Sequence, residues 1–350
     1  MRVLVTGGAG YVGSISAEAL LDAGHEVTVL DSLVTGHVQA VPGEARLIVG
    51  SVGDTSALVA LLLVHEIEAI LHCAARSLVG ESVREPAVYY HENVVGGVAL
   101  LEAMREAGVK RLVFSSSAAV YGLPEATPIT EDAPTRPISP YGATKLAFEG
   151  AIGWYARAYG LRAVSLRYFN AAGASQLNGE DHRPETHLVP NLLKAVLSGK
   201  PMTVMGDDYP TRDGTCVRDY IHVADLADAH LAALERTGRK AVGPGLEVLN
   251  LGSGAGFTVR EVLTACEAVT GRRVPHRIGA RRAGDPAVLV ASNDRAREIL
   301  GWEPRRGSLE ELIGSAWAWR QGHPDGYADG DEPGREPGRP EAALADPSGG

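Results

Sequence analysis

Residues 2–13 read RVLVTGGAGYVG, a short apolar run followed at once by glycines at positions 7, 10 and 13. The run Arg2–Thr6 predicts a buried strand, and the spacing of apolar residues after it predicts a helix over Val12–Ala23. Glycines between strand and helix allow a tight turn, and the helix N-terminus offers unpaired N–H groups to an anion. The stretch therefore predicts a phosphate-binding turn, and a glycine-rich turn without a ligand is the alternative.

Other short apolar runs alternate with amphipathic stretches through the first half of the chain. This alternation is typical of a doubly wound parallel sheet, whose strands are apolar throughout because helices cover both faces. We therefore expect an α/β fold with a dinucleotide-binding (Rossmann) domain at residues 1–172. Its six strands are expected at Arg2–Thr6, Glu26–Leu30, Arg46–Val49, Ala69–Cys73, Arg111–Ser115 and Ala163–Phe169.

The pattern changes from about Gly173, where loops rich in Gly, Asp, His and Pro separate shorter elements. We expect residues 173–322 to form a smaller, interrupted α/β lobe that binds substrate, with some segments returning to the first domain. Its elements include a helix at His222–Thr237, a strand at Leu246–Leu251 and a helix at Thr258–Thr270. Residues 323–350 are rich in Gly, Pro, Asp and Glu and are expected to form a disordered tail.

Composition narrows the possible partners. The 350 residues include 33 basic and 43 acidic ones, so the net charge of −10 gives no basic surface for nucleic acid. The three cysteines are odd in number and widely spaced, which predicts neither a disulfide framework nor a metal site. No signal peptide and no apolar run of about 20 residues is present, so we expect a soluble, cytoplasmic protein with no membrane partner.

Asp31 ends the second predicted strand, where a carboxylate would meet the adenosine ribose of a dinucleotide. A carboxylate there accepts a hydrogen bond from a 2′-hydroxyl and repels a 2′-phosphate, so NAD is favoured over NADP. Asp31 as an ordinary turn residue is the alternative, and the cofactor preference distinguishes the two.

Tyr141 and Lys145 are four residues apart in SPYGATK (139–145), so on a helix they share one face. Phenol is a weak base near neutral pH, but an adjacent ammonium group and a positively charged nicotinamide stabilise the phenolate. Ser115-Ser116-Ser117 ends the fifth predicted strand at the edge where ligands gather. The alternatives are a solvated tyrosine–lysine pair and serines that only cap the strand end.

Several blocks in the same order make residues 1–325 similar to the extended short-chain dehydrogenases/reductases, and most closely to their UDP-glucose 4-epimerase family. The tyrosine–lysine pair marks the whole superfamily, whereas YPTRDGTCVRDYIHVADLA (209–227) is more characteristic of the epimerases. The other blocks include VGES (79–82), SSSAAVYG (115–122), RYFNAAG (167–173) and RRAGDP (281–286).

The resemblance implies reversible C4 epimerisation of UDP-glucose and UDP-galactose through a transient 4-keto sugar, with NAD tightly bound. In that mechanism Tyr141 takes the proton of the 4-hydroxyl, Lys145 binds the nicotinamide ribose and tunes Tyr141, and Ser117 holds the 4-oxygen. The resemblance also implies a homodimer formed through two helices of each subunit.

The expected binding residues follow from the matched positions. For NAD they are Gly7, Gly10, Tyr11, Val12, Gly13, Asp31, Ser32, Ser51, Val52, Cys73, Ala74, Ala75, Asn93, Ser115, Tyr141, Lys145 and Tyr168. For the UDP-sugar they are Ser117, Tyr141, Asn170, His187, Leu188, Thr203, Met205, Arg218, Arg282, Asp285 and Leu289. The two arginines suit a diphosphate, since guanidinium forks onto its oxygens, and surface charge is their alternative.

Four positions depart from the family pattern or vary within it. Ser51 stands where an aspartate usually meets adenine, so Asp54 is expected to face elsewhere, and Ser77 replaces a common lysine. His187 lies in Thr-His-Leu, where relatives often have Asn-Leu beside the substrate phosphates. Leu289 falls where relatives carry tyrosine or a smaller residue beside the 2-substituent of the sugar, which predicts some turnover of UDP-N-acetylhexosamines.

Rival functions remain on the same scaffold. Nucleotide-sugar dehydratases use an Asp-Glu pair just after the fifth strand, and this chain has Ser117-Ala118-Ala119 there. An epimerase acting on UDP-glucuronate or a UDP-pentose is the nearer alternative, and a related decarboxylase would need a carboxylate contact that we cannot assign. A protein that senses NAD without chemistry is remote, because such proteins generally lose the tyrosine or the lysine.

Overall fold

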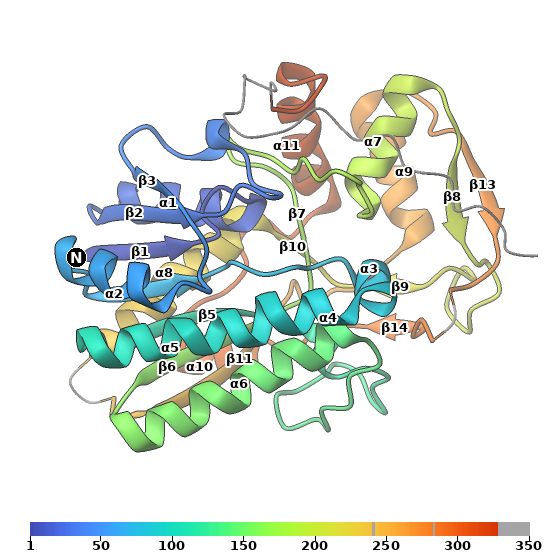
Figure 1. The fold of residues 1–350 in the computed structure, drawn as a ribbon. Coiled ribbons are helices and arrows are strands. Elements are labelled where there is room, and N and C mark those ends of the chain that lie inside the picture. Colours follow the sequence, from blue (N-terminus) through green and yellow to red (C-terminus); the bar gives the residue numbers. More distant parts are fainter. Residues whose placement is uncertain (240–241, 283, 328–350) are drawn as a thin grey trace, which may run out of the picture.

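The computed structural model describes residues 1–239, 242–282 and 284–327. Seven parallel strands form the central sheet in the order β11-β6-β5-β4-β1-β2-β3 (Figure 1). The strand order reverses between β1 and β4, and in such sheets dinucleotides bind at the carboxyl ends of the two strands beside this reversal. The strands are β1 (Arg2–Thr6), β2 (Glu26–Asp31), β3 (Arg46–Val49), β4 (Ala69–His72), β5 (Arg111–Ser117), β6 (Arg162–Tyr168) and β11 (Gly245–Leu251).

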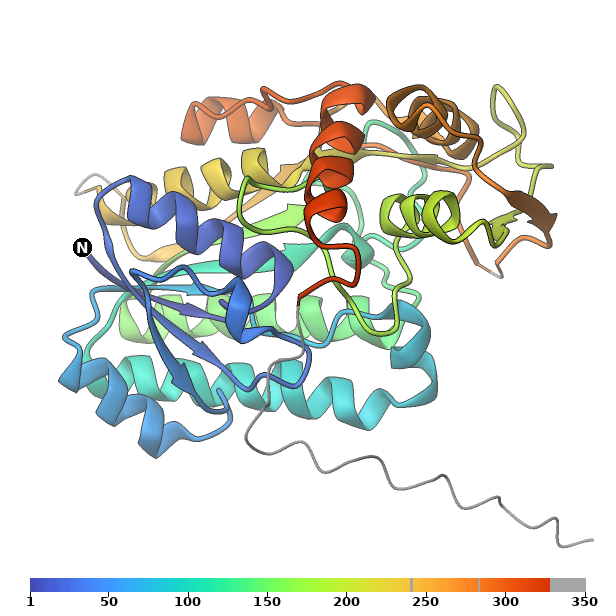
Figure 2. The ribbon, with the colours of Figure 1, turned by 90° about the horizontal axis from the view of Figure 1, so that it is seen from above.

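Helices cover both faces of this sheet, which explains why its strands are apolar throughout (Figures 1 and 2). On one face, α1 (Tyr11–Asp22) packs its apolar residues onto β1 and β2, and α8 (Val223–Gly238) packs onto β5 and β6. On the other face, α2 (Thr55–Val64), α5 (Gly96–Ala107) and α6 (Pro140–Tyr159) enclose a second core. The predicted α/β class is confirmed.

The seventh strand corrects one expectation. The apolar run Leu246–Leu251 was expected to be a strand of the second lobe, but β11 pairs in parallel with β6 at the edge of the central sheet. Helix α8 also returns to this domain after the interruption. Apolar periodicity gives the type of an element but does not say which sheet it joins.

The smaller lobe lies beyond the carboxyl ends of the strands (Figure 1). Its core is formed by α7 (Leu188–Ser198), α9 (Val259–Thr270) and α11 (Leu309–Gly322), with the strand pair β8 (Met202–Met205) and β13 (His276–Gly279). Short strands link the lobe to the site: β7 (Asn170–Ala172), β9 (Val217–Arg218), β10 (Tyr220–His222), β12 (Phe257–Thr258) and β14 (Val288–Leu289). The remaining helical elements are α3 (Val79–Arg84), α4 (Pro86–Tyr89), a π-helical turn (Tyr90–Val95), α10 (Asp294–Leu300) and single 3-10 turns at Val38–Ala40 and Ala118–Val120.

The disordered tail was expected to begin at residue 323, but the folded part of the chain extends as far as Tyr327. The Tyr327 side chain is buried, and its hydroxyl donates to Asn178 Oδ1 at 2.7 Å, so the folded part includes residues 323–327. Composition missed this because one aromatic residue anchors a stretch that is otherwise polar. Residues 328–350, the rest of the expected tail, lie outside the described residues. Among the described helices, none has the length and apolarity needed to cross a bilayer.

Candidate active site

The glycine turn after β1 is tightly packed against its surroundings. Gly7 has a φ of +72°, and a Cβ there would lie 2.5 Å from the backbone nitrogen of Ala74. A Cβ on Gly13 would lie 2.1 Å from the carbonyl oxygen of Gly7. Gly10 caps α1 without a side-chain hydrogen bond, so no side chain competes with a ligand there. This cradle and helix N-terminus fit the pyrophosphate of NAD.

Asp31 fastens the same turn to the end of β2. Its carboxylate accepts hydrogen bonds from the backbone N–H of Ala9 at 3.0 Å and of Leu33 at 2.8 Å. Burial raises the pKa of Asp31, and these two hydrogen bonds oppose part of that rise. The residue therefore positions the turn, and its contact with a cofactor ribose remains a prediction, as does that of the exposed Ser32 beside it.

At the expected adenine end, the Ser51 side chain is exposed and the Val52 side chain is buried. Ser51 Oγ accepts a hydrogen bond from the N–H of Gly53 at 3.1 Å. Asp54 caps α2 by accepting from the N–H of Ala57 at 3.0 Å. Asp54 therefore faces α2, as expected, and contact of Ser51 and Val52 with adenine remains a prediction.

Helix α6 carries Tyr141 and Lys145 at its buried end. It begins at Pro140 after Ser139, whose side chain accepts from the N–H of Gly142. The exposed fractions of Tyr141 and Lys145 are only 8% and 3%, which excludes a solvated pair. The ammonium group of Lys145 donates to the carbonyl oxygen of Ser115 at 2.8 Å and lies 5.9 Å from the centroid of the Tyr141 ring.

The electrostatics of this pair depend on burial. Burial lowers the pKa of Lys145 to about 8, although the nearby Cys73 and Glu149 oppose the shift. Burial raises the pKa of Tyr141, and a hydrogen bond with Ser117 lowers it again. The structure thus brings Tyr141, Lys145 and Ser117 together at the carboxyl end of β5. Ser117 also accepts from the N–H of Ala119 at 3.2 Å, so it both caps the 3-10 turn after β5 and interacts with the phenol.

The buried Ser115 hydroxyl contacts an uncharged histidine, His230, and the thiol of Cys73. The Ser115 hydroxyl is 3.1 Å from Cys73 Sγ and 2.8 Å from Nε2 of His230 on α8. Burial lowers the pKa of His230 to about 4, so its imidazole is uncharged at neutral pH. The Tyr168 ring packs edge-on against His230, with centroids 6.3 Å apart. Sequence reasoning missed His230 because it lies on a distant helix and in no motif with Ser115.

Asn93 connects two other parts of the site. In the π-helical turn, its side chain bonds both the N–H and the carbonyl oxygen of Arg76, at 2.8 and 3.0 Å, and Thr144 Oγ1 at 3.0 Å. The loop that carries Ala74 and Ala75 is thereby tied to α6. Within the described structure Asn93 positions the loop, and its contact with NAD remains a prediction.

A buried ion pair, also missed from sequence, lies one helical turn beyond Lys145. Glu149 on α6 pairs with Arg167 on β6, with the closest oxygen and nitrogen 2.6 Å apart. Ser116 and Ser165 donate to the same carboxylate at 2.6 and 2.8 Å. Removing either charged partner would leave a buried charge uncompensated, so this pair fixes α6 against the sheet.

Three of the expected sugar-binding residues, Arg218, Asp285 and Leu289, lie where β9 and β14 pair. Arg218 and Asp285 form an ion pair at 2.5 Å, and Leu289 is the register partner of Arg218. The amide of Asn170 donates to the carbonyl oxygen of Asp219 at 3.0 Å. Arg282 is exposed, and its carbonyl oxygen accepts from the N–H of Asp285. Thr203 and Met205 lie on β8 of the smaller lobe.

Comparison with known proteins identifies the protein family of this chain. Residues 3–252 match the model of the NAD dependent epimerase/dehydratase family. The chain belongs to this family. UDP-glucose 4-epimerase of Corynebacterium glutamicum is 51% identical over 91% of this chain and 95% of its own. The enzyme of Lactobacillus helveticus is 48% identical over 93% of this chain and 99% of its own.

Solved structures of this family agree. A crystal structure of UDP-glucose 4-epimerase superposes with a TM-score of 0.91 and is 45% identical in sequence. The match covers 94% of this chain and 100% of that one. The crystal structure of UDP-glucose 4-epimerase from Brucella ovis in complex with NAD has a TM-score of 0.88 and is 44% identical. The match covers 91% of this chain and 98% of that one. The resemblance to the UDP-glucose 4-epimerases is therefore confirmed.

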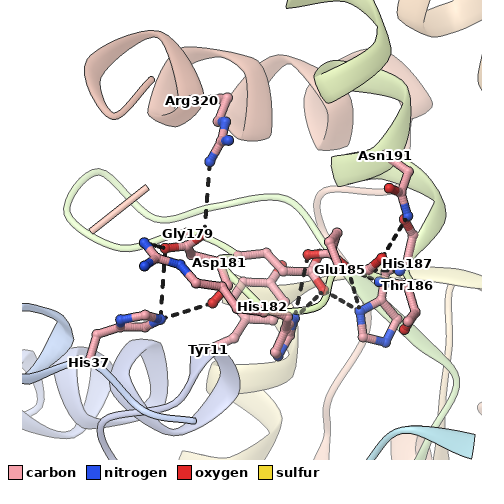
Figure 3. Close-up of polar contacts among 12 residues, drawn as sticks. Tyr11, His37, Gly179, Asp181, His182, Glu185, Thr186, His187, Asn191 and Arg320 are labelled. Carbon is pink, nitrogen blue, oxygen red and sulfur yellow. Dashed lines mark hydrogen bonds and ion pairs between the residues drawn. The ribbon is translucent and has the colours of Figure 1, made fainter. Parts of the chain in front are cut away.

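In this epimerase-family chain, the segment before α7 makes contacts that the sequence did not predict, and binding of the substrate by His187 and Leu188 remains a prediction. His187, expected beside the substrate, precedes the first turn of α7 without a side-chain capping hydrogen bond. Its Nδ1 lies 2.7 Å from a carboxylate oxygen of Glu180 and 3.2 Å from one of Glu185 (Figure 3). Leu188, the first residue of α7, is half-buried in the core of the smaller lobe. The Glu180 and Glu185 partners were missed, although the spacing Glu-x-His-x-x-Glu-x-His (180–187) was a readable signal.

Proposed function

We propose that this chain interconverts UDP-glucose and UDP-galactose by inverting the configuration at C4. The observation that carries the proposal is the Tyr141 phenol, buried between the Ser117 hydroxyl and the Lys145 ammonium group at the carboxyl end of β5. NAD is the cofactor of the family, and the packed glycine turn fits it. The relatives at about half identity are UDP-glucose 4-epimerases, so glucuronate or pentose substrates are not favoured.

The side chains divide the proton chemistry among them. When bound, NAD supplies an acceptor for the hydride of C4 and later returns it. Tyr141 accepts the proton of the 4-hydroxyl, and Ser117 holds the 4-oxygen close to that phenol. Lys145 favours the phenolate electrostatically, because its ammonium group is buried with the tyrosine. The 4-keto sugar then turns about its bond to the diphosphate and presents its opposite face for reduction. Tyr141 returns the proton to the 4-oxygen, and the configuration at C4 is inverted.

The diphosphate requires cations that are already oriented. Arg218 is held by Asp285 and by the carbonyl oxygen of Val217, so its guanidinium is oriented before substrate arrives. We assign it to the diphosphate, with Arg282 as the second cation and Asn170 beside them. We assign Met205 and Thr203 on β8 to the uracil. In this arrangement the nucleotide binds in the smaller lobe and the sugar binds next to Tyr141.

The test uses protein purified without added cofactor. We expect it to interconvert UDP-glucose and UDP-galactose and to release about one NAD per chain on denaturation, because net redox is zero and the cofactor need not leave. Turnover of UDP-glucuronate or a UDP-pentose in preference to UDP-glucose would overturn the substrate assignment. A requirement for added NAD would overturn tight binding.

Leu289 predicts tolerance of a bulky 2-substituent. It is half-buried and packs with Tyr121, Ile129 and Phe169, leaving less bulk beside the sugar than a tyrosine would. We expect wild-type turnover of UDP-N-acetylglucosamine, and a decrease of about 10-fold or more in that kcat/KM for Leu289→Tyr with UDP-glucose turnover retained. No detectable wild-type epimerisation of UDP-N-acetylglucosamine would contradict this prediction.

We also propose a homodimer formed through α5 and α6, which lie side by side on the surface (Figure 1). Trp154 on α6 is 69% exposed and Val95 beside α5 is 56% exposed, an apolar surface that a partner would cover. Trp154→Glu is expected to shift the protein from dimer to monomer in light scattering after size exclusion. Leu197→Glu, at an exposed apolar position on α7, is the control and should remain dimeric.

A cytoplasmic location is the remaining part of this proposal. All three cysteines are free thiols, and Cys216 and Cys266 are buried. Unpaired thiols are best tolerated where the compartment keeps them reduced. Fractionation of cells expressing the natural chain would test the assignment.

A further inference from the structure

Four potential metal ligands meet in the loop that precedes α7. They are Glu180, His182, Glu185 and His187, and one ligand atom from each lies within 4.8 Å of all the others. Figure 3 shows the side chains of His182, Glu185 and His187 converging on one point. The mechanism proposed above gives no role to Glu180, His182 or Glu185.

The distances between these atoms resemble the edges of a tetrahedron. With metal–ligand bonds of about 2.0–2.1 Å, the edges of a tetrahedral zinc site are about 3.3 Å long. His187 Nδ1 lies 2.7 Å from Glu180 and 3.2 Å from Glu185. His182 Nδ1 lies 3.2 Å from Glu180 and 3.7 Å from Glu185. Four of the six distances between ligand atoms are therefore, on average, close to the edge length of a tetrahedral site. Both histidines contribute Nδ1.

Burial gives a second, independent observation. The Glu180 and Glu185 side chains are only 7% and 10% exposed. His182 Nδ1 is fully buried and forms no hydrogen bond of acceptable geometry, although a carboxylate is close. When it is unprotonated, this buried nitrogen has a lone pair aimed into the cluster and no electron-pair acceptor to receive it. A bound cation would supply that acceptor.

A cluster of ion pairs without metal is the competing explanation. Burial lowers the pKa of both imidazoles, but the two nearby carboxylates outweigh this effect and raise the pKa of His182 to about 9 and that of His187 to about 10. Two imidazolium and two carboxylate groups would then be neutral together. The unbonded Nδ1 of His182 is the feature that this explanation leaves unexplained.

We propose that Glu180, His182, Glu185 and His187 bind one zinc ion through two imidazole nitrogens and two carboxylate oxygens. The two carboxylates neutralise the charge of the ion, and nitrogen and oxygen donors in tetrahedral arrangement suit zinc. Four protein ligands leave no open position, so the ion is structural. The cysteine pattern, from which no metal site was predicted, does not include these residues.

The position of the site indicates what the ion would hold. The Tyr11 ring, in the glycine turn, packs edge-on against His182, with centroids 6.2 Å apart, and its hydroxyl donates to the carbonyl oxygen of Gly173. His187 immediately precedes α7 of the smaller lobe. The ion would therefore fix the segment that joins the cofactor turn to the substrate lobe. This inference stands on the ligand geometry and does not require the proposed function.

The experiment measures metal directly. Untagged protein is stripped with a chelator, incubated with zinc sulfate, desalted and analysed by mass spectrometry for metals. We expect about one zinc ion per chain, a Tm that rises by a few degrees on zinc addition, and visible bands of four-coordinate ion after cobalt substitution. His182→Gln should lose the zinc, whereas His276→Gln, at an exposed histidine on β13, should keep it.

Two results would overturn the proposal: no stoichiometric zinc in the wild-type protein, or equal zinc in wild type and His182→Gln. If His182→Gln fails to fold, the cobalt spectrum of the wild-type protein decides. Bands of a four-coordinate ion support the site, and the weak spectrum of a six-coordinate ion contradicts it. Epimerase activity is measured separately, so a failed substrate assignment would not be mistaken for an absent metal.

Discussion

Tyr141→Phe is expected to lower kcat about 10³-fold, within the range of general acid–base catalysis, while NAD remains bound. Such a decrease corresponds to about 4 kcal/mol of transition-state stabilisation. The substitution keeps the buried ring and removes only the hydroxyl that interacts with Ser117. Single-turnover kinetics with UDP-galactose, together with the NAD content of the denatured protein, measure both halves of the prediction.

A neighbouring tyrosine provides the matched control. Tyr89 is also fully buried, and its ring packs edge-on against Tyr141 at 6.5 Å between centroids. Its hydroxyl instead donates to Leu78 and Glu81, so Tyr89→Phe is expected to lower stability by about 1 kcal/mol and to keep most of the turnover. Equal losses of kcat in the two variants would place the chemistry elsewhere.

Gly13→Ala is expected to abolish retention of NAD and, with it, activity. The added Cβ would lie 2.1 Å from the carbonyl oxygen of Gly7, a backbone atom of the turn itself. The turn or the start of α1 must therefore shift, and the N–H groups that face the pyrophosphate shift with it. The measurement is the amount of NAD released per chain from the purified variant, compared with wild type.

Gly314→Ala is the control for this substitution. Gly314 lies inside α11, and a Cβ there would meet nothing within 4 Å. Alanine favours a helix over glycine by about 1 kcal/mol, so this variant should be as stable as wild type or more so, with full NAD content. If Gly13→Ala retained NAD at the wild-type level, the glycine turn would not be the phosphate cradle.

Much of the fold could be predicted from the sequence because its signals are local. Six strands of the central sheet lie within two residues of their predicted positions, since each is a continuous apolar run. The glycine turn and the Tyr141–Lys145 pair are likewise local motifs. Their spacing alone places both side chains on one face of α6, where burial then brings them beside Ser117.

The missed features depend on how the chain folds, and two of them join segments that lie apart in the sequence. His230 reaches Ser115 across 115 positions of the chain, and no motif contains both residues. Glu149 and Arg167 look like ordinary surface charges in the sequence, and only the packing of α6 on β6 makes them a buried pair. The Glu180–His187 cluster was readable as a spacing, but only the folded loop shows that its four ligand atoms converge.

The return of α8 and β11 to the central sheet has a consequence for biosynthesis. A nascent chain that has emerged only as far as Ala172 has β6 as a bare edge strand and lacks the helix that covers part of one apolar face. The cofactor-binding half cannot mature until residues through Leu251 have left the ribosome, and by then β8, β9 and α7 of the smaller lobe have emerged too. We therefore expect the nucleotide-binding half to be completed only after the first elements of the smaller lobe have been synthesised, while α9, β13 and α11 follow later.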